Sequence, residues 1–160
     1  MRSGLGNVNV LEKYFDEASM IEIHGWITLR YSDYHSEEHL QRDFIYNFKS
    51  YLNKAYSGVL SEPYCKFTNY NGLECFSINV QHNHRGDAFY LTKIFSWVAE
   101  HSDGSYGLLY FHDEEDESSF NEFQVYVLKR GTFTKAKDVL LSPYWEEVEK
   151  EYDANDPPRD

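Results

Sequence analysis

The histidines have the spacing that comes closest to a metal-binding or catalytic pattern. His35 and His39 are one helical turn apart, and His82 and His84 flank Asn83 on one side of an extended segment. Imidazole nitrogens are zinc ligands, so the two pairs together would suit a small metal-dependent enzyme. Nothing in the sequence brings the pairs together, and it contains no H-E-x-x-H, G-x-S-x-G, phosphate-loop or dinucleotide-binding motif. We therefore favour histidines that hydrogen-bond locally, and we predict no catalytic residue, no metal and no cofactor.

Two further candidates for chemistry have simpler interpretations. Cys65 and Cys75 are too few for a disulfide framework, and neither is predicted at the positive end of a helix, where thiols become nucleophilic. Arg85 precedes a predicted helix and is placed to bind an anion at the helix start. It is equally suited to pair with one of the many carboxylates, which is the interpretation that we favour.

The most conspicuous feature is a run of acidic residues: Asp113, Glu114, Glu115, Asp116 and Glu117, with Glu122 close behind. Mutual repulsion predicts a hydrated loop, and the run lacks the spacing of a calcium-binding loop. The chain has 27 acidic and 15 basic residues, a formal charge of −12. This charge disfavours direct binding to nucleic acid. Together with the 14 tyrosines, it favours a basic protein partner, attracted by charge and held by amphipathic rings.

Hydrophobic periodicity locates the elements that position these residues. Alternating or continuous apolar residues predict strands over 20–31, 64–70, 73–80, 106–112 and from 123 to before Gly131. Helical spacing predicts helices over 9–19, over about 36–57 with Asp33 or Ser36 at its start, and from Asp87 to before Asp103-Gly104. Ser142-Pro143 predicts a short closing helix that carries Trp145, Val148 and Tyr152.

Asn71-Gly72 between two strand patterns predicts a tight hairpin, because both turn residues need a positive φ. The turn sets the register: Tyr70 faces Leu73, Phe67 faces Phe76, and Cys65 faces Ile78. Cys75 then opposes Thr68 and points to the sheet face away from Cys65. The two side chains diverge, so this register excludes a disulfide between them.

The order strand, helix, hairpin, helix, strand, strand predicts an α+β fold. We expect a two-layer sandwich, a mainly antiparallel sheet with two helices on one face, built on a ferredoxin-like core with an added strand. Residues 1–19 would be an N-terminal extension, 20–152 a single domain and 153–160 a frayed acidic tail. The sequence has no apolar run long enough to span a membrane and no signal-peptide core, so we expect a cytoplasmic protein.

Trp26 lies on the face of the first strand opposite the aliphatic residues, with His24 and Arg30. If helices cover the aliphatic face, Trp26 is partly exposed, as protein-binding hot spots often are. Alternatively, a terminal segment packs over it. The sequence leaves both interpretations open.

Four segments in order resemble the immunity protein 7 family, small α+β proteins encoded beside bacterial polymorphic toxins. They are His24-Gly25-Trp26-Ile27, Asn83-His84-Arg85-Gly86, Gly104 to Tyr110 with the acidic run, and Asn121 to Leu128 ending in Arg130-Gly131. The resemblance covers roughly 20–145, and Leu141-Ser142-Pro143 resembles the closing segment of the family. The family is marked by a Trp and an Arg, which correspond here to Trp26 and Arg85.

The resemblance implies an immunity protein that binds the C-terminal domain of a cognate toxin without catalysis. From the residues we expect the acidic run, Glu122 and the charged helix face of Glu37, Glu38 and Asp43 to steer a basic toxin such as a nuclease. Trp26 and Tyr106 are the candidate anchors, and Arg85 is a further candidate contact. The alternatives are the metal-dependent enzyme that uses His82 and His84, and a sensor with an apolar small-molecule pocket between sheet and helices.

Overall fold

The protein is built on one antiparallel sheet of six strands in the order β2-β3-β1-β4-β5-β6. The computed structural model describes residues 20–35, 37–60, 64–82, 90–150 and 152–157. The strands are β1 (Ile21–Leu29), β2 (Cys65–Tyr70), β3 (Leu73–His82), β4 (Tyr106–Asp113), β5 (Phe123–Lys129) and β6 (Thr132–Lys137).

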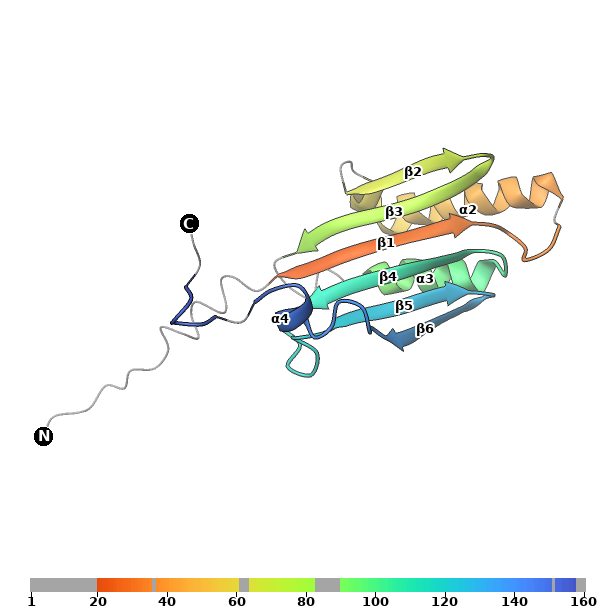
Figure 1. Cartoon of the computed structure of the whole chain (residues 1–160). Helices are drawn as coiled ribbons and strands as arrows, with labels where there is room; N and C mark the ends of the chain where they lie inside the picture. Colours follow the sequence, from red (N-terminus) through yellow and green to blue (C-terminus); the bar gives the residue numbers. More distant parts are fainter. Residues whose placement is uncertain (1–19, 36, 61–63, 83–89, 151, 158–160) are drawn as a thin grey trace, which may run out of the picture.

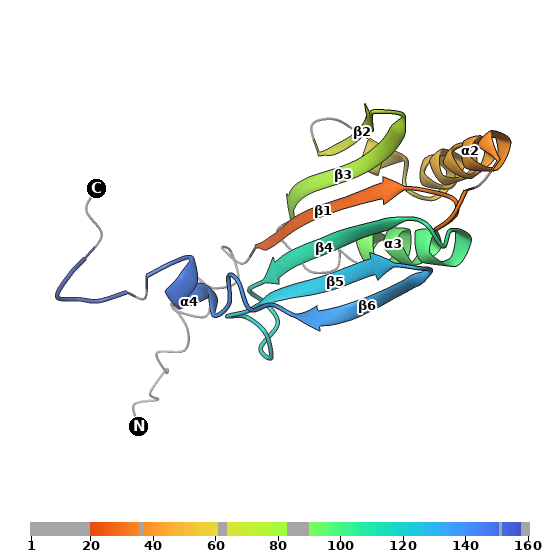
Figure 2. The ribbon, with the colours of Figure 1, turned by 45° about the vertical axis from the view of Figure 1, so that its right-hand side comes forward.

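Two helices, α2 (Glu38–Ala55) and α3 (Tyr90–His101), lie together on one face of this sheet (Figure 1). The turned view shows the same two layers (Figure 2). A short 3-10 helix, η1 (Ser57–Leu60), follows α2, and α4 (Tyr144–Glu147) lies at the end of the sheet where β1 begins (Figure 1). The opposite face of the sheet has neither α2 nor α3 over it. The predicted two-layer α+β sandwich is confirmed.

The core fills the space between the helices and the sheet, because each element buries its apolar side. Ile21, Ile23, Ile27 and Leu29 of β1 are at most 1% exposed. The buried residues of α3 are Leu91, Ile94, Phe95, Val98 and Ala99, the predicted set. Gly25, on the same side of β1, leaves room for the ring of Phe95, since a Cβ there would lie 3.2 Å from it.

The first four strands and the two long helices follow the order β-α-β-β-α-β, with spatial order β2-β3-β1-β4. This is the ferredoxin-like arrangement. The sequence predicted one added strand, and the structure has two, β5 and β6. The second forms because Arg130 and Gly131, with φ of 47° and 70°, make a tight turn, and because Phe133 then packs against Phe95 and Tyr126.

The predicted hairpin between β2 and β3 is confirmed. Asn71 and Gly72 have φ of 55° and 89°, as the turn requires. Tyr70 faces Leu73, Phe67 faces Phe76, Cys65 faces Ile78 and Thr68 faces Cys75. Cys65 is buried toward the helices, whereas Cys75 points to the other face, and both are free thiols.

The helix ends differ from the sequence prediction. The residue before α2 is Glu37, whose side chain makes no capping hydrogen bond, and Asp33 instead pairs with Arg130 at 3.7 Å. The closing helix has only four residues; its Trp145, and Val148 just after it, are 44% and 48% exposed. None of its four residues is buried. The helix predicted over 9–19, the capping residue predicted at Ser36 and the start predicted at Asp87 lie outside the described residues.

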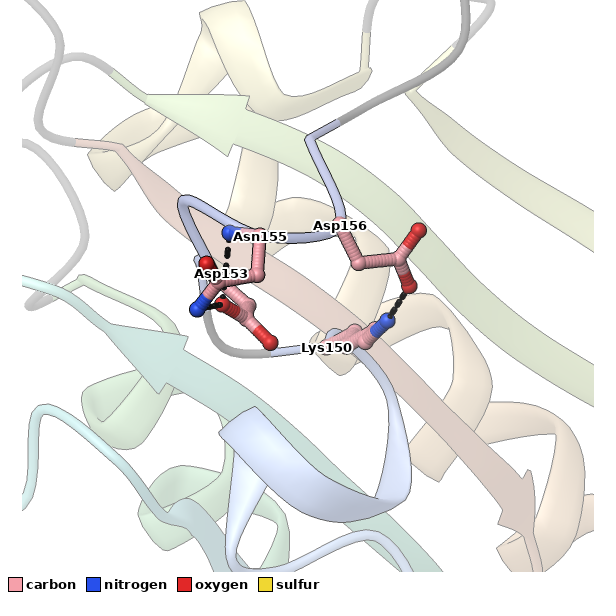
Figure 3. Close-up of polar contacts among 4 residues, drawn as sticks. All are labelled: Lys150, Asp153, Asn155 and Asp156. Carbon is pink, nitrogen blue, oxygen red and sulfur yellow. Dashed lines mark hydrogen bonds and ion pairs between the residues drawn. The ribbon is translucent and has the colours of Figure 1, made fainter.

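The chain continues beyond α4 through a segment with local polar contacts (Figure 3). Lys150 pairs with Asp156, and the Asp153 carboxylate accepts hydrogen bonds from the backbone and side-chain nitrogens of Asn155, at 2.8 and 3.2 Å. These contacts join residues within the segment itself.

Candidate partner-binding site

The sheet face opposite α2 and α3, called the helix-free face because neither long helix covers it, presents an exposed aromatic pair on its two central strands. Trp26 of β1 and Tyr106 of β4 are 39% and 42% exposed. Their rings meet edge to face with centroids 6.0 Å apart, a favourable aromatic geometry. The two candidate anchors that the sequence singled out are therefore neighbours. Each keeps a large part of its ring in solvent.

A groove runs beside Trp26 on this face, with a volume of about 510 Å³. Ser77 and Asn79 of β3 and Leu108 of β4 belong to its lining, and Leu140 and Leu141 form its other rim. The sequence prediction missed this groove. The alternation of Phe76, Ile78 and Val80 already implied that Ser77 and Asn79 face away from the core, but no local pattern placed the rim.

The rim is held in place by one buried carboxylate, Asp138, which is 6% exposed. It accepts hydrogen bonds from the backbone N–H groups of Leu140 and Leu141, at 3.0 and 3.1 Å, and from the Ser142 hydroxyl at 2.6 Å. The Tyr110 hydroxyl of β4 also donates to it. Burial by itself raises the pKa of Asp138, but these hydrogen bonds outweigh burial and lower the pKa below its ordinary value. A charged anchor therefore fixes the segment after β6 against the sheet.

Asn121 fixes the next part of this segment, because its backbone carbonyl and its side chain accept the N–H groups of Tyr144 and Trp145. The ring of Tyr144 stacks on His112 of β4 at 4.1 Å between centroids. His112 is 3% exposed, and its Nε2 lies 2.6 Å from the carbonyl oxygen of Phe120. The alternative was that a terminal segment packs over Trp26; the described segment after β6 covers the His112 end of the face instead, and Trp26 is 39% exposed.

His24 lies on the groove between two polar neighbours. Its Nε2 is 2.7 Å from Glu22 Oε1, and its Nδ1 is 2.8 Å from Asn79 Oδ1. Burial lowers the pKa of His24, but the hydrogen bonds to Glu22 and Asn79 and the charge of Glu22 outweigh it and raise the pKa above 6.5. The charged imidazolium is thus favoured in the folded protein. Its contribution to stability is complete below pH 6.5 and disappears as the pH rises through the folded pKa.

We expect the substitution Glu22→Gln to lower the pKa of His24, because it removes the negative charge beside Nε2. The measurement is an NMR titration of the His24 ring protons in both proteins. Glu100→Gln, which removes an exposed carboxylate from α3 on the other side of the sheet, should leave the His24 curve unchanged. An identical midpoint in the wild type and in Glu22→Gln would show that this pair does not set the titration of His24.

The acidic run begins inside the fold. Asp113 is the last residue of β4 and is 1% exposed, and its Oδ1 accepts the backbone N–H of Glu115 at 3.0 Å. The prediction that the whole run is solvated is therefore wrong for Asp113. Asp116 is half-buried and accepts the N–H and the hydroxyl of Ser118, at 3.0 and 2.7 Å. The residues that present carboxylates on the surface are Glu114, Glu115, Glu117 and Glu122.

The loop meets the start of β1 and α4 at one end of the sheet. Glu114 Oε2 accepts the backbone N–H of Met20 at 3.2 Å, and Glu22 is the β1 partner of His112. Burial and the carboxylates of Glu149, Glu22 and Glu114 raise the pKa of Tyr144. A group of acidic side chains therefore surrounds the Tyr144 end of the helix-free face.

The other predicted steering residues lie away from this end. Glu37, Glu38 and Asp43 are exposed, at and just after the start of α2, which follows the far end of β1. His39 pairs with Glu37 at 3.1 Å. Arg85 lies outside the described residues, so its predicted contact stays a prediction.

The structure also bears on the alternative functions. Burial raises the pKa of Cys65 to about 11, and it also raises the pKa of Cys75, so both thiols are protonated at neutral pH. In the part of the chain that the structure describes, no three His, Cys, Asp or Glu side chains gather as metal ligands would. His84 and the side chain of His82 lie outside that part, so the alternative metal-dependent enzyme that would use them is not tested.

The sensor hypothesis required a pocket between sheet and helices. A hollow of about 490 Å³ lies there, lined by residues that include Tyr56, Tyr64, Val80 and Tyr90. The structure contains no test of small-molecule binding to this hollow, so the sensor stays an alternative.

Among the described helices, none is long and apolar enough to cross a membrane.

A comparison with protein families places this fold and site. The model of the family described as Immunity protein 7 matches residues 20–150, most of the chain and all of its sheet. The chain belongs to the immunity protein 7 family. Membership of the immunity protein 7 family implies a role in protection against a polymorphic toxin, with a toxin as the partner. Comparisons with curated proteins and with solved structures give no match.

Proposed function

We propose that this immunity protein neutralises its toxin in the cytoplasm by forming a non-catalytic complex, and that the toxin domain is basic, as a nuclease is. The observation that carries the proposal is the exposed Trp26–Tyr106 pair on a sheet face flanked by exposed carboxylates. Aromatic side chains supply large contact areas at the centre of interfaces. Carboxylates around them raise the rate at which a basic partner arrives.

The proposed roles separate into steering and anchoring. Residues with carboxylates on or near the surface accelerate association. They are Glu114, Glu115, Asp116, Glu117 and Glu122 at one end of the sheet, and Glu37 just before α2 with Glu38 and Asp43 on it. Trp26 and Tyr106 lose their exposed area in the complex and slow its dissociation. Asp113 is too buried for a contact and instead shapes the loop.

The test is growth rescue with the C-terminal toxin domain encoded by the adjacent open reading frame. We expect that co-expression of the full chain restores growth and that the two proteins co-purify as a complex stable in size-exclusion chromatography. The Trp26→Ala, Tyr106→Ala double variant should restore growth less well at equal abundance. Lysozyme, an unrelated basic protein, controls for attraction by charge alone and should not co-elute. If the wild-type chain neither rescues growth nor binds the toxin domain, the proposal is wrong.

A further inference from the structure

We infer that the toxin docks in the groove on the helix-free face, and that it inserts an apolar segment with a lysine or arginine at the Tyr144 end. The inference rests on the proposed function and adds the place of contact and the chemistry of the segment that binds there. The lining of the groove includes Trp26 and His24 of β1 together with Leu140 and Leu141 of the segment after β6.

The groove is apolar at its rims and already formed. Trp26 is 39% exposed, Leu140 74% and Leu141 41%. Neighbouring exposed apolar side chains of this size are typical of interaction sites. The Leu140–Leu141 rim keeps its position because Asp138 accepts both backbone N–H groups and also the Tyr110 hydroxyl from the sheet. An incoming segment would therefore meet a preorganised surface, which lowers the entropy cost of binding.

The charges of this face select a cationic partner. At the Tyr144 end, Glu22 is the β-sheet partner of His112, on which Tyr144 stacks. The backbone N–H of Glu149 donates to the Tyr144 carbonyl at 2.9 Å, and Glu114 holds the N–H of Met20. Among the described residues that line the groove, none is a lysine or an arginine. A cation on the partner would thus find carboxylates at this end, and the basic group of the described groove lining, His24, is already paired with Glu22.

The same charges disfavour two other occupants. A second copy of this chain would bring an identical acidic end and a net charge of −12 to the interface, and like charges across an interface oppose binding. Nucleic acid would bring phosphates to the same carboxylates. A basic protein segment is the occupant whose charge complements the site.

The first test uses two asparagine variants that change the net charge equally. Asn79→Arg places a cation and a long side chain in the groove, whereas Asn53→Arg places them on the exposed surface of α2. In titration calorimetry with the adjacent-frame toxin domain, Asn79→Arg should weaken binding about tenfold or more. Asn53→Arg should stay within about twofold of the wild type. Thermal unfolding of the free proteins verifies that both variants are folded.

The second test addresses the cation at the Tyr144 end. Glu149→Lys reverses an exposed charge beside Tyr144, and Glu100→Lys makes the same change on α3. We expect about tenfold weaker binding for Glu149→Lys and a change within about twofold for Glu100→Lys.

The outcomes separate the inference from the proposed function. If the wild type binds the toxin domain and Asn79→Arg binds equally well, the groove is not the docking site, although the immunity function stands. If Glu149→Lys and Glu100→Lys weaken binding equally, no cation is recognised at the Tyr144 end. Light scattering provides a third arm: a wild-type dimer that Asn79→Arg converts to monomers, with unchanged toxin affinity, would assign the groove to a second copy and overturn the inference.

Discussion

Replacing Gly107 with alanine is expected to lower the free energy of unfolding by about 3 kcal/mol or more. Gly107 is buried in β4 opposite Ile27 of β1. A Cβ at this position would overlap the carbonyl oxygen of Trp26 and lie 2.9 Å from the Cα of Ile27. Both are backbone atoms of the central strand, so the clash cannot be relieved by rotating a side chain. Guanidinium denaturation of the wild type and the variant measures the difference.

Two other glycines provide a graded control. A Cβ on Gly25 would meet the side chains of Ile78, Leu109 and Phe95 at 3.2 Å, which can shift slightly, so Gly25→Ala should cost less than Gly107→Ala. A Cβ on Gly58 would have no neighbour within 4 Å, so Gly58→Ala should be close to neutral. If Gly107→Ala unfolds within 1 kcal/mol of the wild type, roughly the size of an ordinary surface change, the tight approach of β4 to β1 is not a constraint on the fold.

The central part of the fold could be predicted because local chemistry determines it. Asn71-Gly72 permits the positive φ values of a tight turn, and the turn then fixes which residues of β2 and β3 face each other. In α3, the helical spacing of apolar residues matches the buried face residue by residue. These features are set by residues close together in sequence, so the sequence alone is enough to predict them.

The missed features depend on contacts between distant residues. The strand β6 has lysines at 135 and 137, and most of its residues are exposed, so its composition resembles that of a loop. The contact that supports it as a strand, Phe133 on Phe95, joins residues far apart in sequence. Asp113 is buried because it pairs with Ile21 of β1. The charge of the run predicts a solvated loop and gives no sign of this pairing. The Leu140–Leu141 rim exists because Asp138 meets Tyr110 across 28 residues of sequence. The sequence therefore singled out Trp26 as a candidate anchor but did not predict the groove beside it.

Reversing the exposed charges of the acidic loop is expected to lower the association rate constant with the toxin domain by about tenfold to a hundredfold at low salt. The variant is Glu114→Lys, Glu115→Lys, Glu117→Lys; it omits the buried Asp113 and the half-buried Asp116, whose hydrogen bonds shape the loop. Attraction between opposite charges steers a basic partner before contact, so it acts on association more than on dissociation. Stopped-flow fluorescence at several salt concentrations gives the rate constants.

Because of its position, reversing charges on the loop should slow association more than reversing the same number of charges elsewhere. Glu37→Lys, Glu38→Lys, Asp43→Lys alters the net charge by the same amount, but on α2, beyond the far end of β1. Because screening limits charge effects to about 10 Å at 0.1 M salt, the loop variant should slow association more, and its rate should depend less on salt than that of the wild type. Equal slowing in both variants would show that only the total charge matters. If the loop variant associates at the wild-type rate, the loop takes no part in steering, because reversing carboxylates that guide the partner toward the Tyr144 end must change the association rate constant.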